Sequence, residues 1–287
     1  MPSPPDTGNL LGWWKADGTL WQHNDGTTAV SADGDLIGRW EDASGNGKHM
    51  EVADANRPTF KTSIQNSLPV VRMAGKFLNT NSHTIAIPQA FTLYLVSKQT
   101  GDATREAICG SDAFEQGTQV FQHNTTMSGG AGTMRFQRYG GSNPLVDAGS
   151  LGTSAFKLIV LWTDATGIES FINDVSQGTA AYGGTPATAT QGVSLGGNGF
   201  VGSTGTNTDF GEALFYGVAH DAATRKSAES YLNTKWGLGI AGLGSGGGAN
   251  KGGGAHAHSP GGSSGGGKGK HKAEVGGAAA YLILPPL

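Results

Sequence analysis

Apolar side chains recur along this chain in short runs that are separated by glycine-rich turns. Within the runs, apolar positions are continuous or alternate with polar ones, which is typical of fully buried or half-buried strands. Runs of this kind cover residues 10–16, 91–97, 119–123, 133–139, 155–163, 168–172, 193–197 and 213–216. This spacing, with Gly-rich turns, predicts an all-β antiparallel sandwich rather than alternating α/β units, and a different all-β barrel is the alternative.

A helical period stands out between residues 221 and 237. Asp221 is placed to accept a hydrogen bond from the amide of Thr224 as an N-cap, and Gly237 suits a left-handed C-terminus. The face between them carries Ala228, Tyr231, Leu232 and Trp236 at helical spacing. Because a lone short helix is marginal in water, we expect it to pack on an edge of the sandwich as a lid.

Several local motifs accompany these elements. The helix ends in 231–238, Tyr-Leu-Asn-Thr-Lys-Trp-Gly-Leu, and a Trp-x-Asp-x-Ser-Gly-x-Gly turn begins at Trp40. An Asn-Arg-Pro step at 56–58 and a Leu-Pro-Val-Val strand at 68–71 follow, and an apolar strand ending in Trp-x-Asp leads to a hairpin that turns at 173–174. Over residues 10–238 the chain resembles the LamG-like (laminin-G/concanavalin A-like) jelly-roll domains of bacterial and phage proteins. The resemblance implies a two-sheet jelly roll with one C-terminal helix.

Bulk composition narrows the classes of function. The chain has 287 residues, 14% of them charged, and a formal net charge of −3, which does not favour nucleic acid as a partner. Cys109 is the single cysteine and has apolar neighbours, so we expect a buried, inert thiol. The sequence has no apolar run long enough to cross a bilayer. The start, Met1-Pro-Ser-Pro-Pro-Asp, does not read as a signal peptide.

The composition changes abruptly after the helix, and this change divides the chain into three expected parts. Residues 1–240 form the jelly-roll domain, 241–277 a Gly-rich flexible linker and 278–287 an apolar C-terminal segment. The last segment contains Tyr281, Leu282, Ile283 and Leu284, which as an extended strand could pair with a sheet edge of a partner protein. We therefore predict that it anchors the chain to an assembly.

Two candidate sites lie within the expected jelly roll. Arg135, Gln137 and Tyr139 alternate with apolar residues, so they should share the outer face of one strand, where they could contact a glycan or simply be solvated. Asp42 can bond the amides of the Ser-Gly-Asn-Gly turn that follows it. It is also a weak candidate ligand for Ca²⁺, since nothing near it in the sequence supplies further oxygen ligands at a suitable spacing. No other metal or cofactor is expected.

These features lead to three hypotheses about function. The first is a non-enzymatic virion protein, such as a decoration or fibre protein, that displays the jelly roll at the virion surface and is anchored by its tail. The second is a free extracellular lectin, and the third is a divergent glycan hydrolase. The paired Glu-x-Asp-x-x-Glu run of hydrolases with this fold is absent, and Glu41 and Asp42 are adjacent, so in a strand they would face opposite sides. We expect assembly proteins and cell-surface glycans as partners, a homo-oligomer, and no membrane or nucleic-acid contact.

Overall fold

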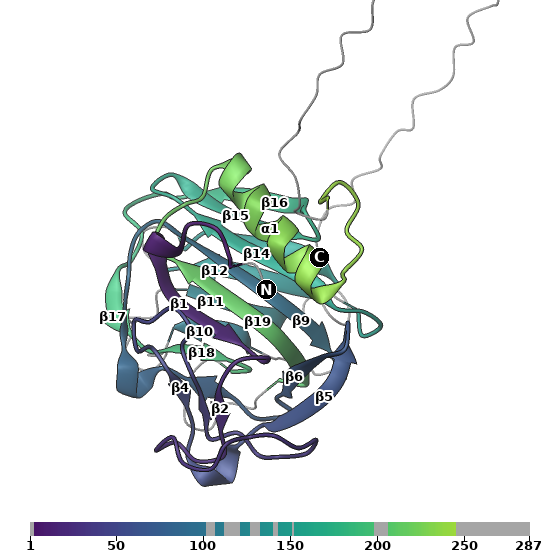
Figure 1. The fold of residues 1–287 in the computed structure, drawn as a ribbon. Coiled ribbons are helices and arrows are strands. Elements are labelled where there is room, and N and C mark those ends of the chain that lie inside the picture. Colours follow the sequence, from purple (N-terminus) through teal and green to yellow (C-terminus); the bar gives the residue numbers. More distant parts are fainter. Residues whose placement is uncertain are drawn as a thin grey trace, which may run out of the picture. The chain divides into compact units, whose positions relative to one another are not determined.

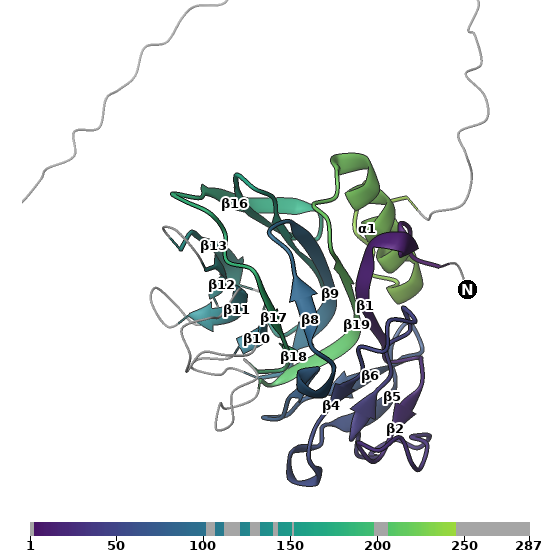
Figure 2. The same ribbon diagram turned by 90° about the vertical axis from the view of Figure 1, so that its left-hand side faces the viewer.

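The computed structural model describes residues 3–101, 107–111, 121–126, 133–139, 143–150, 152–197 and 206–244. These residues lie in a compact unit that spans Met1–Gly247. Two antiparallel sheets face each other, and an α-helix covers the outer side of one of them (Figure 2). The all-β, two-sheet sandwich with a C-terminal helix is therefore confirmed.

Sheet A lies under the helix and has eight strands. Its order is β16 (Val175–Ala181), β15 (Gly167–Ile172), β14 (Lys157–Thr163), β9 (Phe91–Gln99), β19 (Thr208–Tyr216), β6 (Leu68–Arg72) and β5 (Thr59–Gln65), with β1 (Leu10–Lys15) also paired to β19. The predicted hairpin joins β15 to β16 through Asn173 and Asp174, both with positive φ (51° and 66°). Asp174 thus adopts the left-handed conformation that glycine would adopt more readily.

Sheet B has nine strands and forms the opposite layer. Its order is β13 (Leu145–Ser150), β12 (Thr133–Arg138), β11 (Phe121–Thr126), β10 (Ala107–Ser111), β18 (Val193–Leu195), β7 (Leu78–Asn79), β4 (Met50–Glu51), β3 (Arg39–Trp40) and β2 (Leu20–Trp21). A small sheet pairs β17 (Ala189–Gln191) with β8 (Ile85–Ile87), and short 3₁₀ turns cover η1 (Thr7–Asn9), η2 (Asp54–Asn56) and η3 (Asn81–His83). The sequence pattern did not predict β13 and β16, which carry few large apolar side chains.

The core lies between the two sheets and is rich in aromatic rings. Phe91 on β9 packs edge-to-face on Phe215 of β19 and on Phe136 of β12, with ring centroids 5.3 and 6.5 Å away. All three rings are fully buried. Cys109 is also buried, and its burial raises the pKa of the thiol, as expected for an inert side chain.

Strand β19 is central to sheet A, and its nine residues are all buried. It pairs with β9 on one side, and with both β1 and β6 on the other. Its buried run begins earlier than the pattern predicted, because Asp209 is neutralised by Arg72 through two hydrogen bonds of 2.7 Å. A charged residue can therefore occupy the start of this strand with 1% exposure.

Helix α1 (Ala222–Trp236) runs across the outer face of sheet A, as Figure 1 shows. The predicted ends are confirmed: the side chain of Asp221 accepts a bond of 2.7 Å from the Thr224 amide, and Gly237 is left-handed with φ 59°. Its predicted apolar face, Ala228, Tyr231, Leu232 and Trp236, is buried. The expectation of an edge position was wrong, because β19 presents an acceptor for this helix in the middle of the sheet.

That acceptor is the carboxylate of Glu212 on β19, which is fully buried beneath α1. Its Oε1 accepts from the indole of Trp13 (2.6 Å) and the hydroxyl of Tyr231 (2.9 Å). Its Oε2 accepts from the indole of Trp236 (2.8 Å) and contacts the ammonium of Lys235 (2.8 Å). Glu212, which is isolated from other carboxylates in the sequence, thus joins β1, β19 and α1. We call these five side chains the Glu212 node.

Adjacent tryptophans on β1 divide between the two faces of sheet A, as their alternation requires. Trp14 is fully buried and donates from its indole to the backbone oxygen of Lys48 at 2.8 Å. Trp13 points the other way, toward the Glu212 node. One ring therefore lies in the core, while the other contacts β19 and the helix through Glu212.

The described chain continues to pack on α1 beyond the helix itself. The Asn233 side chain donates to the backbone oxygen of Leu243 at 2.8 Å and accepts from the amide of Ile240 at 3.0 Å. Leu243 is 4% exposed and belongs to the core. The packed body therefore reaches residue 244. Residues 245–287, with the predicted anchor Tyr281, Leu282, Ile283 and Leu284, lie outside the described residues.

We expect Trp236→Ala to reduce the free energy of unfolding by about 3–5 kcal/mol, the range for a buried large aromatic. Trp236 is fully buried, and its ring lies so close to Gly211 that a Cβ there would approach within 2.7 Å. Trp236→Phe, which keeps a ring but removes the donor to Glu212, should cost about 1–3 kcal/mol. Urea unfolding measures both, with Leu36→Ala at an exposed site as the control. A loss below ~1 kcal/mol for the alanine variant would contradict this packing.

Candidate functional site

The three predicted glycan-contacting residues do share the outer face of sheet B. Arg135, Gln137 and Tyr139 are partly exposed, while Phe136 and Arg138 between them are fully buried. Arg135 lies opposite Asp147 on β13, and its guanidinium donates two hydrogen bonds to that carboxylate, at 2.6 and 2.9 Å. The arginine is thus already bound in a bidentate pair, which leaves less of it available to a ligand than the sequence indicated.

Arg138 has a structural role that the sequence pattern did not reveal. Its guanidinium donates to the backbone oxygens of Pro88 (2.7 Å) and Ala187 (2.8 Å) and lies 4.9 Å over the ring of Phe91. Burial lowers the pKa of Arg138 to about 10. The side chain therefore holds two loops against the end of the core, and it is not accessible to a ligand.

Asp42 bonds the amides of its own turn, as its Ser-Gly-Asn-Gly setting predicts. Its Oδ1 accepts from the amides of Trp13 and Ser44, and its Oδ2 from the Ser44 hydroxyl and the Lys48 amide, all at 2.8–2.9 Å. A carboxylate offers about four acceptor positions, and all of them are used here. Asp42 thus fixes its own turn against β1, which leaves little capacity for Ca²⁺. No group of three or more His, Cys, Asp or Glu side chains is placed to hold a metal ion within the described ranges.

The structure brings together a set of polar side chains that the sequence analysis had not associated. Strand pairing places Trp21 beside Arg39 and Arg39 beside Glu51, on the outer face of β2, β3 and β4. Leu20, Trp40 and Met50 on the opposite face are buried in the core. Glu41, His49 and His83 join the outer set from the adjoining loops and η3. We call this set of Trp21, Arg39, Glu41, His49, Glu51 and His83 the outer cluster.

Direct contacts within the outer cluster fix its side chains. Glu41 Oε1 accepts from the Trp21 indole at 2.8 Å and lies 3.0 Å from Arg39 Nε. Arg39 Nη1 also lies 3.5 Å from Glu51, which in turn pairs with His83 at 3.2 Å. Because each polar group is already positioned by a neighbour, a ligand would meet a preorganised surface.

The two histidines of the cluster contribute polar groups that are open to solvent. Their rings meet edge-to-face at 5.1 Å, and the side chains are 19% (His49) and 30% (His83) exposed. His49 Nδ1 lies against the Glu41 carboxylate and accepts from the Asp42 amide at 3.2 Å. Burial lowers the pKa of His49, an effect that the Glu41 carboxylate partly offsets.

Gly26 keeps the space above part of the outer cluster open. It has φ +77° and belongs to the loop that follows β2. A Cβ on this residue would lie 3.7 Å from Arg39 Nη1 and 3.9 Å from Trp21 Nε1. The glycine therefore allows the loop to pass close to both groups without a side chain that would cover them.

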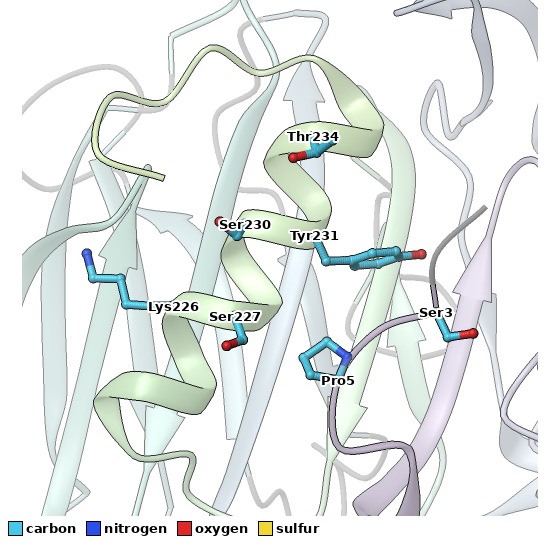
Figure 3. Close-up of a pocket in the computed structure, with 7 residues that line it drawn as sticks. All are labelled: Ser3, Pro5, Lys226, Ser227, Ser230, Tyr231 and Thr234. Carbon is cyan, nitrogen blue, oxygen red and sulfur yellow. The ribbon is translucent and has the colours of Figure 1, made fainter. Parts of the chain in front are cut away.

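A groove of about 450 Å³ lies elsewhere, between the N-terminal segment and α1 (Figure 3). It is lined by Ser3, Pro5, Lys226, Ser227, Ser230, Tyr231 and Thr234. Most of its polar groups are bound within the protein: the Tyr231 hydroxyl to Glu212, the Ser230 hydroxyl to the Gly244 oxygen, and Lys226 to Asp174. The groove also carries only one charged side chain, Lys226, and no imidazole or indole, so it offers fewer kinds of polar group than the outer cluster does.

Two buried titratable groups beneath α1 are also occupied by structural contacts. Burial raises the pKa of Glu229 to about 7, with Arg225 at 2.6 Å partly offsetting the effect. Burial lowers the pKa of His220. Its Nδ1 shares a hydrogen bond of 2.8 Å with the Tyr94 hydroxyl, and its Nε2 lies 3.2 Å from the Asp6 carboxylate. Both are enclosed, so they stabilise the packing of α1 and of the N-terminal segment rather than form an open site.

Comparison with known proteins identifies the fold and not a family. No known protein family and no curated protein sequence matches the chain. The ligand-binding domain of botulinum neurotoxin serotype D, solved with N-acetylneuraminic acid, is similar with a TM-score of 0.54 and 8% identity, over 81% of this chain and 54% of that one. The binding domain of Paraclostridial Mosquitocidal Protein 1 is similar with a TM-score of 0.50 and 12% identity, over 80% and 55%.

Sialidases are a second group of similar structures. Trypanosoma rangeli sialidase, solved with a difluoro-KDN ligand, gives a TM-score of 0.52 and 13% identity, over 82% of this chain and 36% of the sialidase. The chain thus spans about a third of the sialidases and about half of the two binding domains that it matches. At these identities the likeness shows the fold alone, and it supports the concanavalin A-like jelly roll that the sequence resemblance implied.

Proposed function

We propose that this protein binds carbohydrate, without catalysis, through the outer cluster on β2, β3 and β4. The observation that carries the proposal is the cluster itself: a partly exposed indole surrounded by an arginine, two carboxylates and two imidazoles whose positions are fixed by mutual contacts. Sugars present hydroxyls that need both donors and acceptors, and C–H faces that pack on aromatic rings. The cluster supplies each kind of group on one accessible face.

The accessible surfaces of the fold support this location. The outer face of sheet A is covered by α1, whereas the outer cluster and the β12–β13 face lie on sheet B. Figure 2 shows β12 and β13 across the sandwich from α1, and β2 and β4 below β1 and the helix. On β12, Arg135 is engaged with Asp147 and the neighbouring exposed Leu145 is aliphatic. We therefore rank Arg135, Gln137 and Tyr139 as the second candidate surface.

Charge indicates the class of sugar. Apart from the histidines, one arginine and two glutamates give the outer cluster a formal charge of −1. A carboxylate-bearing sugar, such as the N-acetylneuraminic acid bound to the similar neurotoxin domain, would meet like charge there. We infer that neutral hexoses or their oligosaccharides are the ligands.

A glycan array probed with the full-length protein should show neutral glycans bound in preference to sialylated ones. With the best neutral glycan in solution, Trp21→Ala and His83→Ala should each weaken binding at least about tenfold, ~1.4 kcal/mol, because each removes one wall of the cluster. Arg135→Ala, on the second candidate surface of the same sheet, is the matched control and should leave the affinity unchanged. Each variant is first checked for an unchanged thermal melt.

Two results would contradict this assignment. A loss of affinity with Arg135→Ala but not with Trp21→Ala would move the site to the β12–β13 face. No binding to any glycan, with the protein folded, would refute carbohydrate recognition altogether. Release of reducing sugar by the wild-type protein would instead support the hydrolase alternative.

We further propose that the tail that follows the described body, residues 245–287, anchors the protein in a larger assembly such as a virion surface. The support is its sequence: a glycine-rich stretch that cannot form a core, followed by the apolar run Tyr281, Leu282, Ile283 and Leu284. Extended, this run could add a strand to a partner's sheet edge, and Pro285 and Pro286 would end the pairing.

Deletion of residues 278–287 should abolish incorporation into the parent assembly, because the apolar run supplies the contact with the partner. The thermal melt and glycan binding of the isolated protein should remain unchanged, because the deletion begins 34 residues after Gly244, the last described residue. Co-sedimentation of the truncated and full-length proteins with the assembly measures the difference. Equal incorporation of the two would refute anchoring by the tail and would move the attachment surface to the jelly roll.

A further inference from the structure

Lys235, in the last turn of α1, is held between two carboxylates. Its Nζ lies 2.9 Å from Oδ1 of Asp17, in the turn after β1, and 2.8 Å from Oε2 of Glu212 on β19. The three residues come from distant parts of the sequence, and the fold brings an amine, a carboxyl group and a second carboxylate into mutual contact.

Water has little access to this triad. The side chains of Lys235, Asp17 and Glu212 are 5%, 10% and 0% exposed. The ammonium lies 5.6 Å from the Trp236 ring and 6.0 Å from the Tyr231 ring. By contrast, Lys226 makes its ion pair with Asp174 while 47% exposed. Burying a neutral amide costs less desolvation free energy than burying an ammonium beside two carboxylates. Water, which would hydrolyse an amide bond, has little access to the site.

Glu212 is fixed in a position from which it can accept and return a proton. Its two oxygens receive the indole N–H groups of Trp13 and Trp236 and the hydroxyl of Tyr231, in addition to the Lys235 ammonium. Three neutral donors orient the carboxylate without protonating it. A carboxylate at 2.8 Å from an ammonium nitrogen lies within the distance required for general acid–base transfer.

We propose that Lys235 and Asp17 condense to an intramolecular isopeptide bond, with Glu212 as the proton-transferring group. Glu212 takes one proton from the Lys235 ammonium, and the free amine attacks Cγ of Asp17 to form the N–C bond. The tetrahedral intermediate then collapses, and one Asp17 oxygen leaves as water. That oxygen receives one proton from Glu212 and a second proton from the attacking nitrogen. Ammonium and carboxylate become amide and water, with no oxidant, cofactor or external energy source.

Such a bond would join the two ends of the packed body. Asp17 follows β1, the first strand of sheet A. Lys235 lies nine residues before Gly244, the last described residue. A load applied through the chain after Gly244 would reach β1 and β19 through a covalent link as well as through the Glu212 node. This property suits a domain that is held by one end.

The direct test is the intact mass of the purified full-length protein under denaturing conditions. We expect a mass lower by one water molecule than the sequence requires. Trypsin should leave Lys235 uncut and yield residues 16–39 joined to residues 227–251, which tandem mass spectrometry identifies. A full sequence mass together with free peptides after prolonged incubation of the folded protein would overturn the proposal, leaving an ion pair only.

Variants assign the chemistry to the triad. Lys235→Arg keeps the positive charge but cannot condense in this way, so the full mass should return. Asp17→Asn should still form the bond with loss of ammonia, so its mass should fall by one ammonia molecule instead of one water. Lys226→Arg, at the exposed pair, is the matched control and should keep the one-water loss. A one-water loss that persists in Lys235→Arg would refute the assignment.

The role of Glu212 is tested by Glu212→Gln, with circular dichroism recorded to confirm that the variant folds. A folded variant with the full mass supports proton transfer by Glu212, whereas a folded variant that still loses water refutes that role. Should this variant not fold, the wild-type peptide map and the Asp17→Asn mass decide the proposal by themselves.

Discussion

The buried carboxylate of Glu212 is the interaction on which the arrangement of this molecule depends. An ionised group without partners in a protein interior would be strongly destabilising. Here four donors from β1 and α1 surround it on the face of β19 that the helix covers. Because all four must be present together, the first strand, the last strand and the helix are required to assemble as one unit. The same requirement explains why α1 lies across the middle of sheet A and not at its edge.

Because α1 covers the outer face of sheet A, both candidate binding surfaces lie on sheet B. On sheet B, β12 and β13 carry the Arg135–Asp147 pair, and β2 to β4 carry the outer cluster. The outer cluster combines an indole with fixed donors and acceptors, and its formal charge favours neutral sugars. The outer cluster and the helix therefore belong to different sheets of the sandwich.

The sequence predicted the elements whose signals are local. The strand runs, the Asp221 cap, the buried face of α1 and the left-handed Gly237 could all be read from spacing and residue type, because each depends on neighbours a few positions away. The outer cluster could not be read from the sequence. Its members come from strands and loops between residues 21 and 83, and only strand pairing places them together. The buried charged residues Arg138, Asp209 and Glu212 interrupt the apolar pattern. Their burial could not be predicted, because the groups that bind them are remote in the sequence.

The central claim, that Glu212 links β1 to α1, is tested most directly by a double-mutant cycle between Trp13→Phe and Trp236→Phe. The two indoles come from opposite ends of the body and donate to different oxygens of the same carboxylate. Losing the second donor should cost more than losing the first, because fewer partners then remain for the buried charge. The measured quantity is the coupling between the two changes in the free energy of unfolding, and we predict ~0.5–3 kcal/mol beyond the sum of the single variants. Additivity within about 0.5 kcal/mol would contradict the claim.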